Sequence, residues 1–128
     1  MKYKVLVIED NEQNIYLMDF LLRSRGFEVI QARDGMSGIG MARETAPDLI
    51  LLDIQLPGMD GYAVAEQLIG DPAFCKAPIV AVTSYAMVGD KEKVLAAGCT
   101  GYIEKPIDPD TFIESISRFL EPPRDGKE

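Results

Sequence analysis

The chain has 128 residues, of which 47% are hydrophobic, enough for one globular domain with a buried core but too few for two. Its formal net charge is -8, and with no basic cluster along the chain we predict that it does not bind nucleic acid phosphates. It contains no His, which excludes Ser-His-Asp and Cys-His catalysis and any phosphohistidine chemistry within the chain.

The sequence shows no signal for a membrane or for secretion. No apolar stretch approaches the roughly 18 residues of a membrane span, and the N-terminal MKYKVLVIEDN lacks the cleavage region of a signal peptide. We therefore expect no membrane contact and a cytoplasmic location. Cys75 and Cys99 do not have the spacing of metal ligands, and we interpret both as buried packing thiols.

Short apolar runs rich in β-branched residues alternate with amphipathic segments along the chain. Five runs are predicted to be strands: KVLVI (4–8), FEVIQA (27–32), LILL (49–52), IVAVT (79–83) and GYI (101–103). Strands that are apolar almost throughout are typical of a parallel sheet with helices on both faces. The order of the elements therefore predicts an α/β fold made of successive βα units.

Several of the intervening segments show apolar residues at helical spacing. The first carries Ile15, Met18 and Leu22, and the third carries Val64 and Leu68. These residues are predicted to face the sheet.

The last segment has the clearest helix pattern. Asp108 is its predicted N-cap and Pro109 its first helical residue, and the apolar face consists of Phe112, Ile116 and Leu120. The polar EPPRDGKE that follows is predicted to be disordered, so we place the folded domain at residues 1–121 and a tail at 122–128.

Polar residues follow most of the predicted strands at their carboxyl ends, where ligands bind in an open α/β sheet. They are Glu9-Asp10 after the first strand, Asp53 after the third, Thr83-Ser84 at the end of the fourth, and Glu104-Lys105-Pro106 after the fifth. Three carboxylates in one partly buried cleft repel one another unless a cation lies between them. Oxygen ligands without imidazole or thiolate favour Mg²⁺, with Mn²⁺ as the second choice.

Each of these residues taken singly has an ordinary structural explanation. Asp53 could start the turn QLPGMDG, and Glu9-Asp10 could favour the start of a helix capped by Asn11. Thr83 could be a β-branched strand residue, and Lys105-Pro106 a surface Lys before a turn. Their occurrence together at four strand ends favours a shared site.

Four segments resemble the receiver domain of two-component response regulators in order and separation: VLVIEDN, DLILLDIQLPGMDG, IVAVTSYAMVGD and AAGCTGYIEKPI. The resemblance extends from about Lys4 to Leu120. It implies a flavodoxin-like (βα)5 three-layer sandwich with a parallel five-stranded sheet in the order 2-1-3-4-5. Within the family, DIQLPGMDG and AMVGDKEKV are most similar to single-domain receivers of the DivK type and to receivers of hybrid kinases.

The resemblance implies a phosphorylation site. Asp53 corresponds to the phosphoacceptor, and Mg²⁺ would be held by Glu9, Asp10, Asp53 and the backbone carbonyl of Gln55. The metal would neutralise charge on the transferred phosphoryl group. Where many relatives have two Asp residues the acid pair here is Glu-Asp, which lengthens one arm without removing a ligand.

The resemblance also implies residues that bind and sense the phosphoryl group. Lys105 would be its cationic partner and Thr83 its hydroxyl partner, and Tyr102 would turn inward when Thr83 moves toward the phosphoryl group. A cis peptide is implied between Lys105 and Pro106. Two further positions, Gln55 and Tyr85, would tune the rate of dephosphorylation.

We therefore interpret the chain as a stand-alone signalling phosphoacceptor, which catalyses only its own phosphorylation and dephosphorylation. The donor would be a sensor histidine kinase or a histidine phosphotransfer protein. The downstream protein target would read the charge change at Asp53 on the face built from the fourth helix, the fifth strand and the fifth helix.

Four other functions are compatible with parts of the sequence. The chain could be a receiver segment of a hybrid histidine kinase, or a Mg²⁺-dependent phosphohydrolase, although Gln55 stands where such an enzyme carries a second acid. A flavodoxin-like FMN carrier would need a phosphate-binding loop, and EDNEQN would repel the phosphate. A DNA-binding regulator would need an output domain, and the eight residues after Leu120 are too few for one.

Overall fold

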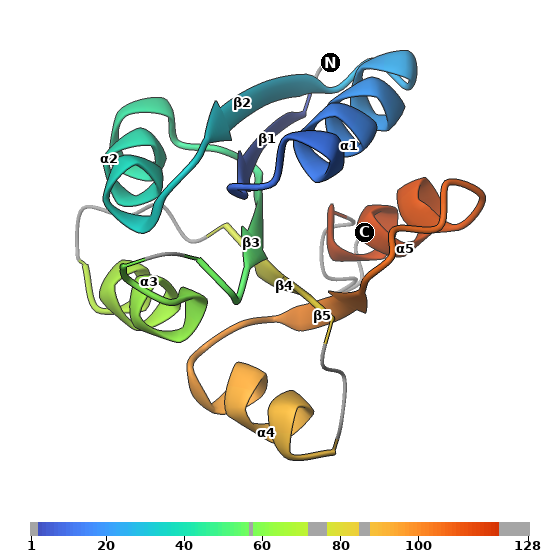
Figure 1. Ribbon diagram of the computed structural model, residues 1–128. Helices are drawn as coiled ribbons and strands as arrows, with labels where there is room; N and C mark the ends of the chain where they lie inside the picture. The colour runs from blue at the N-terminus through green and yellow to red at the C-terminus, as the bar shows by residue number, and fades with distance from the viewer. Residues whose placement is uncertain (1–2, 57, 72–76, 85–87, 121–128) are drawn as a thin grey trace, which may run out of the picture.

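A five-stranded parallel sheet lies between two layers of helices (Figure 1). The computed structural model describes residues 3–56, 58–71, 77–84 and 88–120. Within these ranges the elements are β1 (Lys4–Ile8), α1 (Glu12–Ser24), β2 (Glu28–Ala32), α2 (Gly35–Thr45), β3 (Leu49–Asp53), α3 (Gly61–Ile69), β4 (Ile79–Thr83), α4 (Val88–Ala96), β5 (Gly101–Glu104) and α5 (Phe112–Leu120). All five predicted strands are confirmed to within one residue at each end.

The strands are ordered β2-β1-β3-β4-β5, which confirms the flavodoxin-like topology. Every neighbouring pair is parallel, with Ile8 opposite Leu52, Asp53 opposite Val82, and Thr83 opposite Glu104. The carboxyl ends of the strands therefore meet at one edge of the sheet, where the polar residues singled out in the sequence lie.

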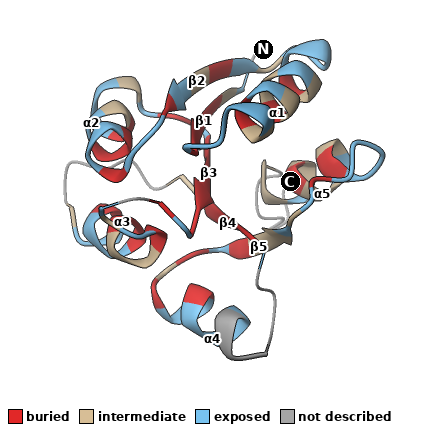
Figure 2. Cartoon of the chain, in the orientation of Figure 1, coloured by how far each residue is buried: buried red, intermediate tan, exposed pale blue. Residues whose placement is uncertain are grey.

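The apolar strands bury both faces of the sheet (Figure 2). On one face, side chains such as Leu6, Ile50 and Ala81 pack with α2, α3 and α4. On the other, side chains such as Val7 and Leu51 pack with α1 and α5. Because side chains alternate along a strand, this division also determines toward which helices each residue at a strand end points.

The predicted helix faces pack against the sheet. Ile15, Met18, Leu22, Val64, Leu68, Phe112 and Ile116 are buried, and Leu120 is half-buried against the core on the α1 and α5 side. Asn11 caps α1, because its side chain accepts a 3.0 Å hydrogen bond from the backbone N–H of Asn14. Cys99 is buried as predicted, whereas Cys75 falls outside the described residues.

The predicted start of the last helix is wrong by three residues. The α5 helix begins at Phe112, not at Pro109. The carbonyl of Asp108 accepts from the backbone N–H groups of Thr111 and Phe112, and its carboxylate accepts from Asp110 N–H at 3.0 Å. An Asp-Pro pair suits a turn as well as a helix start, and here it forms the turn that precedes the helix.

Within the described ranges, no helix has both the length and the apolar character that a membrane crossing requires. The predicted tail, residues 122–128, lies outside those ranges.

Candidate functional site

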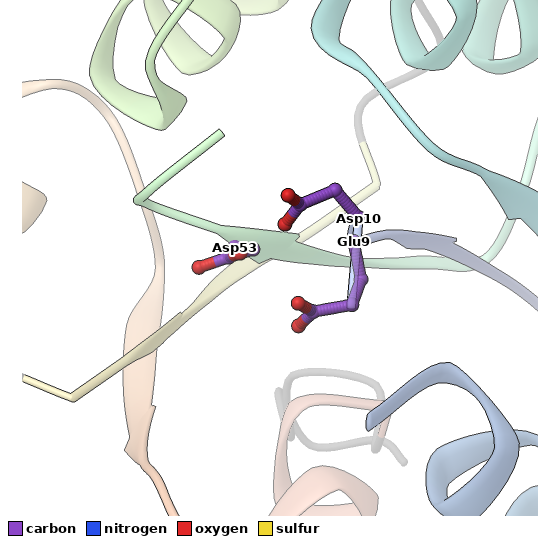
Figure 3. A group of neighbouring side chains, drawn as sticks. All are labelled: Glu9, Asp10 and Asp53. Carbon is purple, nitrogen blue, oxygen red and sulfur yellow. The ribbon is translucent and has the colours of Figure 1, made fainter. Parts of the chain in front are cut away.

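Three carboxylates meet at the carboxyl ends of β1 and β3. Glu9 and Asp10 follow β1, and Asp53 is the last residue of β3. One carboxylate oxygen from each residue lies within 4.8 Å of those of the other two. Figure 3 shows the three carboxyl groups turned toward a shared space beyond the strand ends. The sequence prediction that these acids lie close together is confirmed.

Glu9 and Asp10 lie in different environments although they are adjacent in the chain. The backbone N–H of Glu9 bonds to the carbonyl of Ala32 at 2.9 Å, which continues the pairing with β2 for one residue. Glu9 is 0% exposed, and its Oε2 accepts a 3.2 Å hydrogen bond from the backbone N–H of Asn11. Asp10 is exposed. The buried acid is therefore Glu9, while Asp10 borders the solvent side of the cluster.

Lys105 brings a positive charge to the two buried acids. Its Nζ lies 3.2 Å from Oε1 of Glu9 and 3.3 Å from Oδ1 of Asp53. The ammonium donates a hydrogen bond to Oε2 of Glu9, at 3.3 Å. The side chain is only 12% exposed, so solvent screens this charge weakly. The peptide bond between Lys105 and Pro106 is cis.

Asp53 is 2% exposed and points out of the strand edge toward Lys105. Its Oδ1 accepts a 3.0 Å hydrogen bond from the backbone N–H of Gln55, which orients the carboxylate. The following loop is held close to the strand, because the N–H of Gly61 bonds to the carbonyl of Ile54 at 2.9 Å. A Cβ at Gly61 would lie 2.5 Å from Ile54 Cα and 2.7 Å from Asp53 O, so this approach requires glycine.

Thr83 and Tyr102 lie on the face of the sheet that packs with α2, α3 and α4. Thr83 is buried at the end of β4, in line with Ala81 on the face that packs with α2, α3 and α4. Tyr102 lies opposite Ala81 in the sheet and packs, half-buried, against the same core. The two side chains are thus diagonal neighbours on adjacent strands. Tyr85 falls outside the described residues.

Comparisons with known proteins agree with this fold. Residues 5–117 match the family described as the response regulator receiver domain. The chain is 43% identical over 120 residues to the polar-differentiation response regulator DivK of Brucella anthropi, an alignment that covers 94% of this chain and 98% of that protein. The chain belongs to the response regulator receiver domain family. It is a phosphorylatable response regulator of two-component signalling, of the DivK and CheY type.

Solved receiver structures have the same fold. The chemotaxis response regulator CheY4 of Vibrio cholerae is 27% identical, with a TM-score of 0.88 over 94% of this chain and 100% of that one. The receiver domain of a sensor histidine kinase from Pseudomonas aeruginosa is 31% identical, with a TM-score of 0.85 over 94% of this chain and 98% of that one. That second structure is described with a magnesium ion coordinated in its active site cleft. The hybrid-kinase and phosphohydrolase alternatives are not favoured.

The surroundings of Glu9 in this receiver disfavour its ionised form. The pKa of Glu9 is raised from 4.5 to about 7, mainly because the side chain is buried and next because of the neighbouring charge of Asp53, while Lys105 lowers it in part. One cation therefore only partly offsets two buried acids. A second positive charge at the cluster would favour the ionised form of Glu9.

The acids fit a divalent cation. Glu9 Oε1 is buried and lies 3.2 Å from the Lys105 ammonium, but among the described residues it accepts no hydrogen bond, so it is available as a metal ligand. With one oxygen each from Glu9, Asp10 and Asp53, the donor set is hard and anionic, as Mg²⁺ prefers. Binding of Mg²⁺ is typical of the receiver family.

The site opens into a pocket of about 530 Å³, which contains residues that the sequence reasoning missed. Besides the acids, Lys105 and Gln55, its walls include Asn14 and Glu12 from the first turn of α1. Asn14 is half-buried there, three residues after the N-cap Asn11. The cap pattern predicted where α1 begins, and from this a first-turn residue at the mouth of the site could have been inferred.

Proposed function

We propose that Asp53 is the phosphoacceptor of this receiver and that Glu9, Asp10, Asp53 and the carbonyl of Gln55 hold the Mg²⁺ that phosphoryl transfer requires. The observation that carries the proposal is the position of the Asp53 carboxylate, within 4.8 Å of the Glu9 and Asp10 oxygens and 3.3 Å from the Lys105 ammonium. No other cluster of three potential metal ligands occurs in the described part of the chain.

The proposed chemistry is a single displacement. A carboxylate oxygen of Asp53 attacks the phosphorus of a phosphohistidine or of a small phosphodonor, and the bond to the leaving group breaks as the new P–O bond forms. The Gln55 N–H fixes the direction of the carboxylate through its bond to Oδ1. When bound, Mg²⁺ would supply positive charge to the phosphoryl oxygens, and Lys105, 3.3 Å from Asp53, would supply a second positive charge.

The proposal extends to the residues that sense the phosphoryl group. The Thr83 hydroxyl would move toward a phosphoryl oxygen, and the Tyr102 ring would occupy the space that it leaves. Their position as diagonal neighbours on β4 and β5 supports this coupling. Gln55 and Tyr85 would set the lifetime of the acyl phosphate.

We propose a sensor histidine kinase or a histidine phosphotransfer protein as the donor, acting in the cytoplasm, and a protein target on the α4-β5-α5 face. A pocket of about 550 Å³ between these elements supports the choice of face. Its walls include Lys91 from α4, Tyr102 and Glu104 from β5, and Phe112 and Ser115 from α5. A phosphotransfer profile against the kinases of the source organism would identify the donor.

Intact-mass measurement tests the phosphoacceptor. After incubation with acetyl phosphate and Mg²⁺, the wild-type protein should gain one phosphoryl group, and EDTA should abolish the gain. Asp53→Asn should gain none. Asp60→Asn is the matched control, because Asp60 caps α3 and Asn is an equally good cap. Labelling that persists in Asp53→Asn would refute the assignment.

A further inference from the structure

A lysine of α4 lies over the ring of Tyr102. The Nζ of Lys91 is 5.3 Å from the centroid of the Tyr102 ring, within the range of a cation–π contact. Lys91 is exposed, whereas the ring is half-buried against the core on the α2, α3 and α4 side. Both residues line the pocket between α4, β5 and α5. The contact therefore joins α4 to the side chain that we assign to the relay.

The electrostatics around Lys91 agree with this contact. The pKa of Lys91 is raised, chiefly by its interaction with Tyr102 and to a smaller extent by the charge of Glu104. Glu104 lies two residues after Tyr102 in β5 and lines the same pocket. The Lys91 ammonium thus lies over the Tyr102 ring, and an acid of the same strand lines the same pocket.

We propose that Lys91 is a positioning residue that holds the Tyr102 ring in its present place and so opposes the inward turn that phosphorylation favours. This inference rests on the proposed function, because it needs Tyr102 to act as a relay. A contact made in one conformation alone shifts the equilibrium between two conformations toward that one. Removing the Lys91 ammonium should therefore raise the population of the inward conformation.

By linkage, the same change must tighten binding at the phosphoryl site. A ligand that favours the inward conformation binds more tightly when that conformation is already more populated. An exposed cation–π contact corresponds to a change of about two- to fivefold in such an equilibrium. The predicted effect is therefore a small increase in affinity at Asp53, caused by a substitution on α4.

The protein contains a matched control on the same helix. The Nζ of Lys93 lies 5.6 Å from the ring centroid of Tyr62, a residue of α3. Lys93 is also exposed and carries the same charge, so its substitution changes the net charge of the protein equally. Tyr62 lies on a helix and not on the strand next to Thr83, so loss of this second contact should not change the affinity at Asp53.

The experiment measures the affinity of the full chain for beryllofluoride, a phosphoryl analogue, in Mg²⁺ by fluorine NMR. Lys91→Met should lower the apparent dissociation constant by about two- to fivefold. Lys91→Arg, which keeps a cation, and Lys93→Met should both bind like the wild type. In a Tyr102→Ala background, Lys91→Met should have no further effect. Melting temperatures identify any variant that has lost its fold.

Equal affinity of Lys91→Met and Lys93→Met would overturn the proposal, as would an effect of Lys91→Met that persists in Tyr102→Ala. If the wild type bound no beryllofluoride, the proposed function would fail instead. The positioning claim would then be decided by proton NMR of the Tyr102 ring, assigned with Tyr102→Phe. Its signals should shift in Lys91→Met but not in Lys93→Met, and unchanged signals in Lys91→Met would refute the contact.

Discussion

The Lys105 ammonium lies 3.2 Å from Oε1 of Glu9, and the two groups come from opposite ends of the chain. Both side chains are nearly buried, and the same ammonium also contacts Asp53. In the absence of metal, this single cation faces two buried acids.

Glu9 should make the metal-free protein less stable as the pH rises. Its pKa is about 7 in the folded protein against 4.5 ordinarily, so between these values the folded state holds a proton that the unfolded chain has lost. The free energy of unfolding should therefore fall as the pH rises from about 4.5 to about 7, and then level off. At about pH 8 in EDTA, Glu9→Gln should be the more stable protein by up to about 3 kcal/mol.

Urea unfolding of wild type and Glu9→Gln across this pH range, in EDTA, checks the prediction. Asp10→Asn removes an exposed charge from the same cluster and should stabilise the protein less. A constant difference between wild type and Glu9→Gln from about pH 5 to about pH 8 would show that Glu9 does not titrate with a raised pKa.

Lys105→Met should destabilise the metal-free protein most at high pH. The substitution leaves Glu9 and Asp53 without their cation, and an unpaired buried charge costs about 3 kcal/mol. Near pH 5 Glu9 is protonated and the loss should be smaller, since less charge is left unpaired. Phosphorylation by acetyl phosphate should also slow. Equal destabilisation at both pH values would mean that Lys105 acts mainly through packing.

Two glycines should respond in opposite ways to the addition of a methyl group. Gly61→Ala should destabilise the protein by about 1–3 kcal/mol, because the new Cβ would meet backbone atoms of Ile54 and Asp53. Gly40 lies within α2, where a Cβ would meet nothing within 4 Å, so Gly40→Ala should stabilise the protein by about 0.5–1 kcal/mol. Thermal melts of both variants decide; a stable Gly61→Ala would contradict the close approach after β3.

Thr83→Ala and Tyr102→Ala should separate phosphoryl capture from signal transmission. Neither residue belongs to the carboxylate cluster, so both variants should still accept a phosphoryl group. Because the relay would be broken, the affinity for the downstream partner should not rise on phosphorylation. Partner affinity measured before and after phosphorylation tests this. A normal increase in Thr83→Ala would argue against the relay.

Local patterns in the sequence predict most of the fold. The five apolar runs become the five strands, because a parallel sheet covered on both faces requires them to be apolar throughout. Where two structures suit the same residues, the pattern fails. The pair Asp108-Pro109 is common both at the start of a helix and in a turn. Phe112 and Ile116 pack against the sheet in either case, so their burial does not distinguish the two structures.

For the site, the sequence predicts which residues meet but not how each is surrounded. Glu9 is buried and Asp10 exposed, and the backbone N–H of Glu9 bonds to Ala32, which extends the pairing of β1 with β2 by one residue. That bond depends on the register of a strand distant in sequence. The Lys91 contact with Tyr102 likewise depends on how α4 packs against β5, and no spacing in the sequence encodes this distance.

The central claim is that Asp53 receives the phosphoryl group, and chemical mapping of the modified residue tests it most directly. Borohydride reduces an aspartyl phosphate to homoserine, so the protein is phosphorylated with acetyl phosphate and Mg²⁺, reduced, digested and analysed by mass spectrometry. We predict homoserine at position 53 in the wild type. None should form when EDTA is present during the incubation with acetyl phosphate. Reduction products at Glu9 or Asp10, with Asp53 unmodified, would contradict the account.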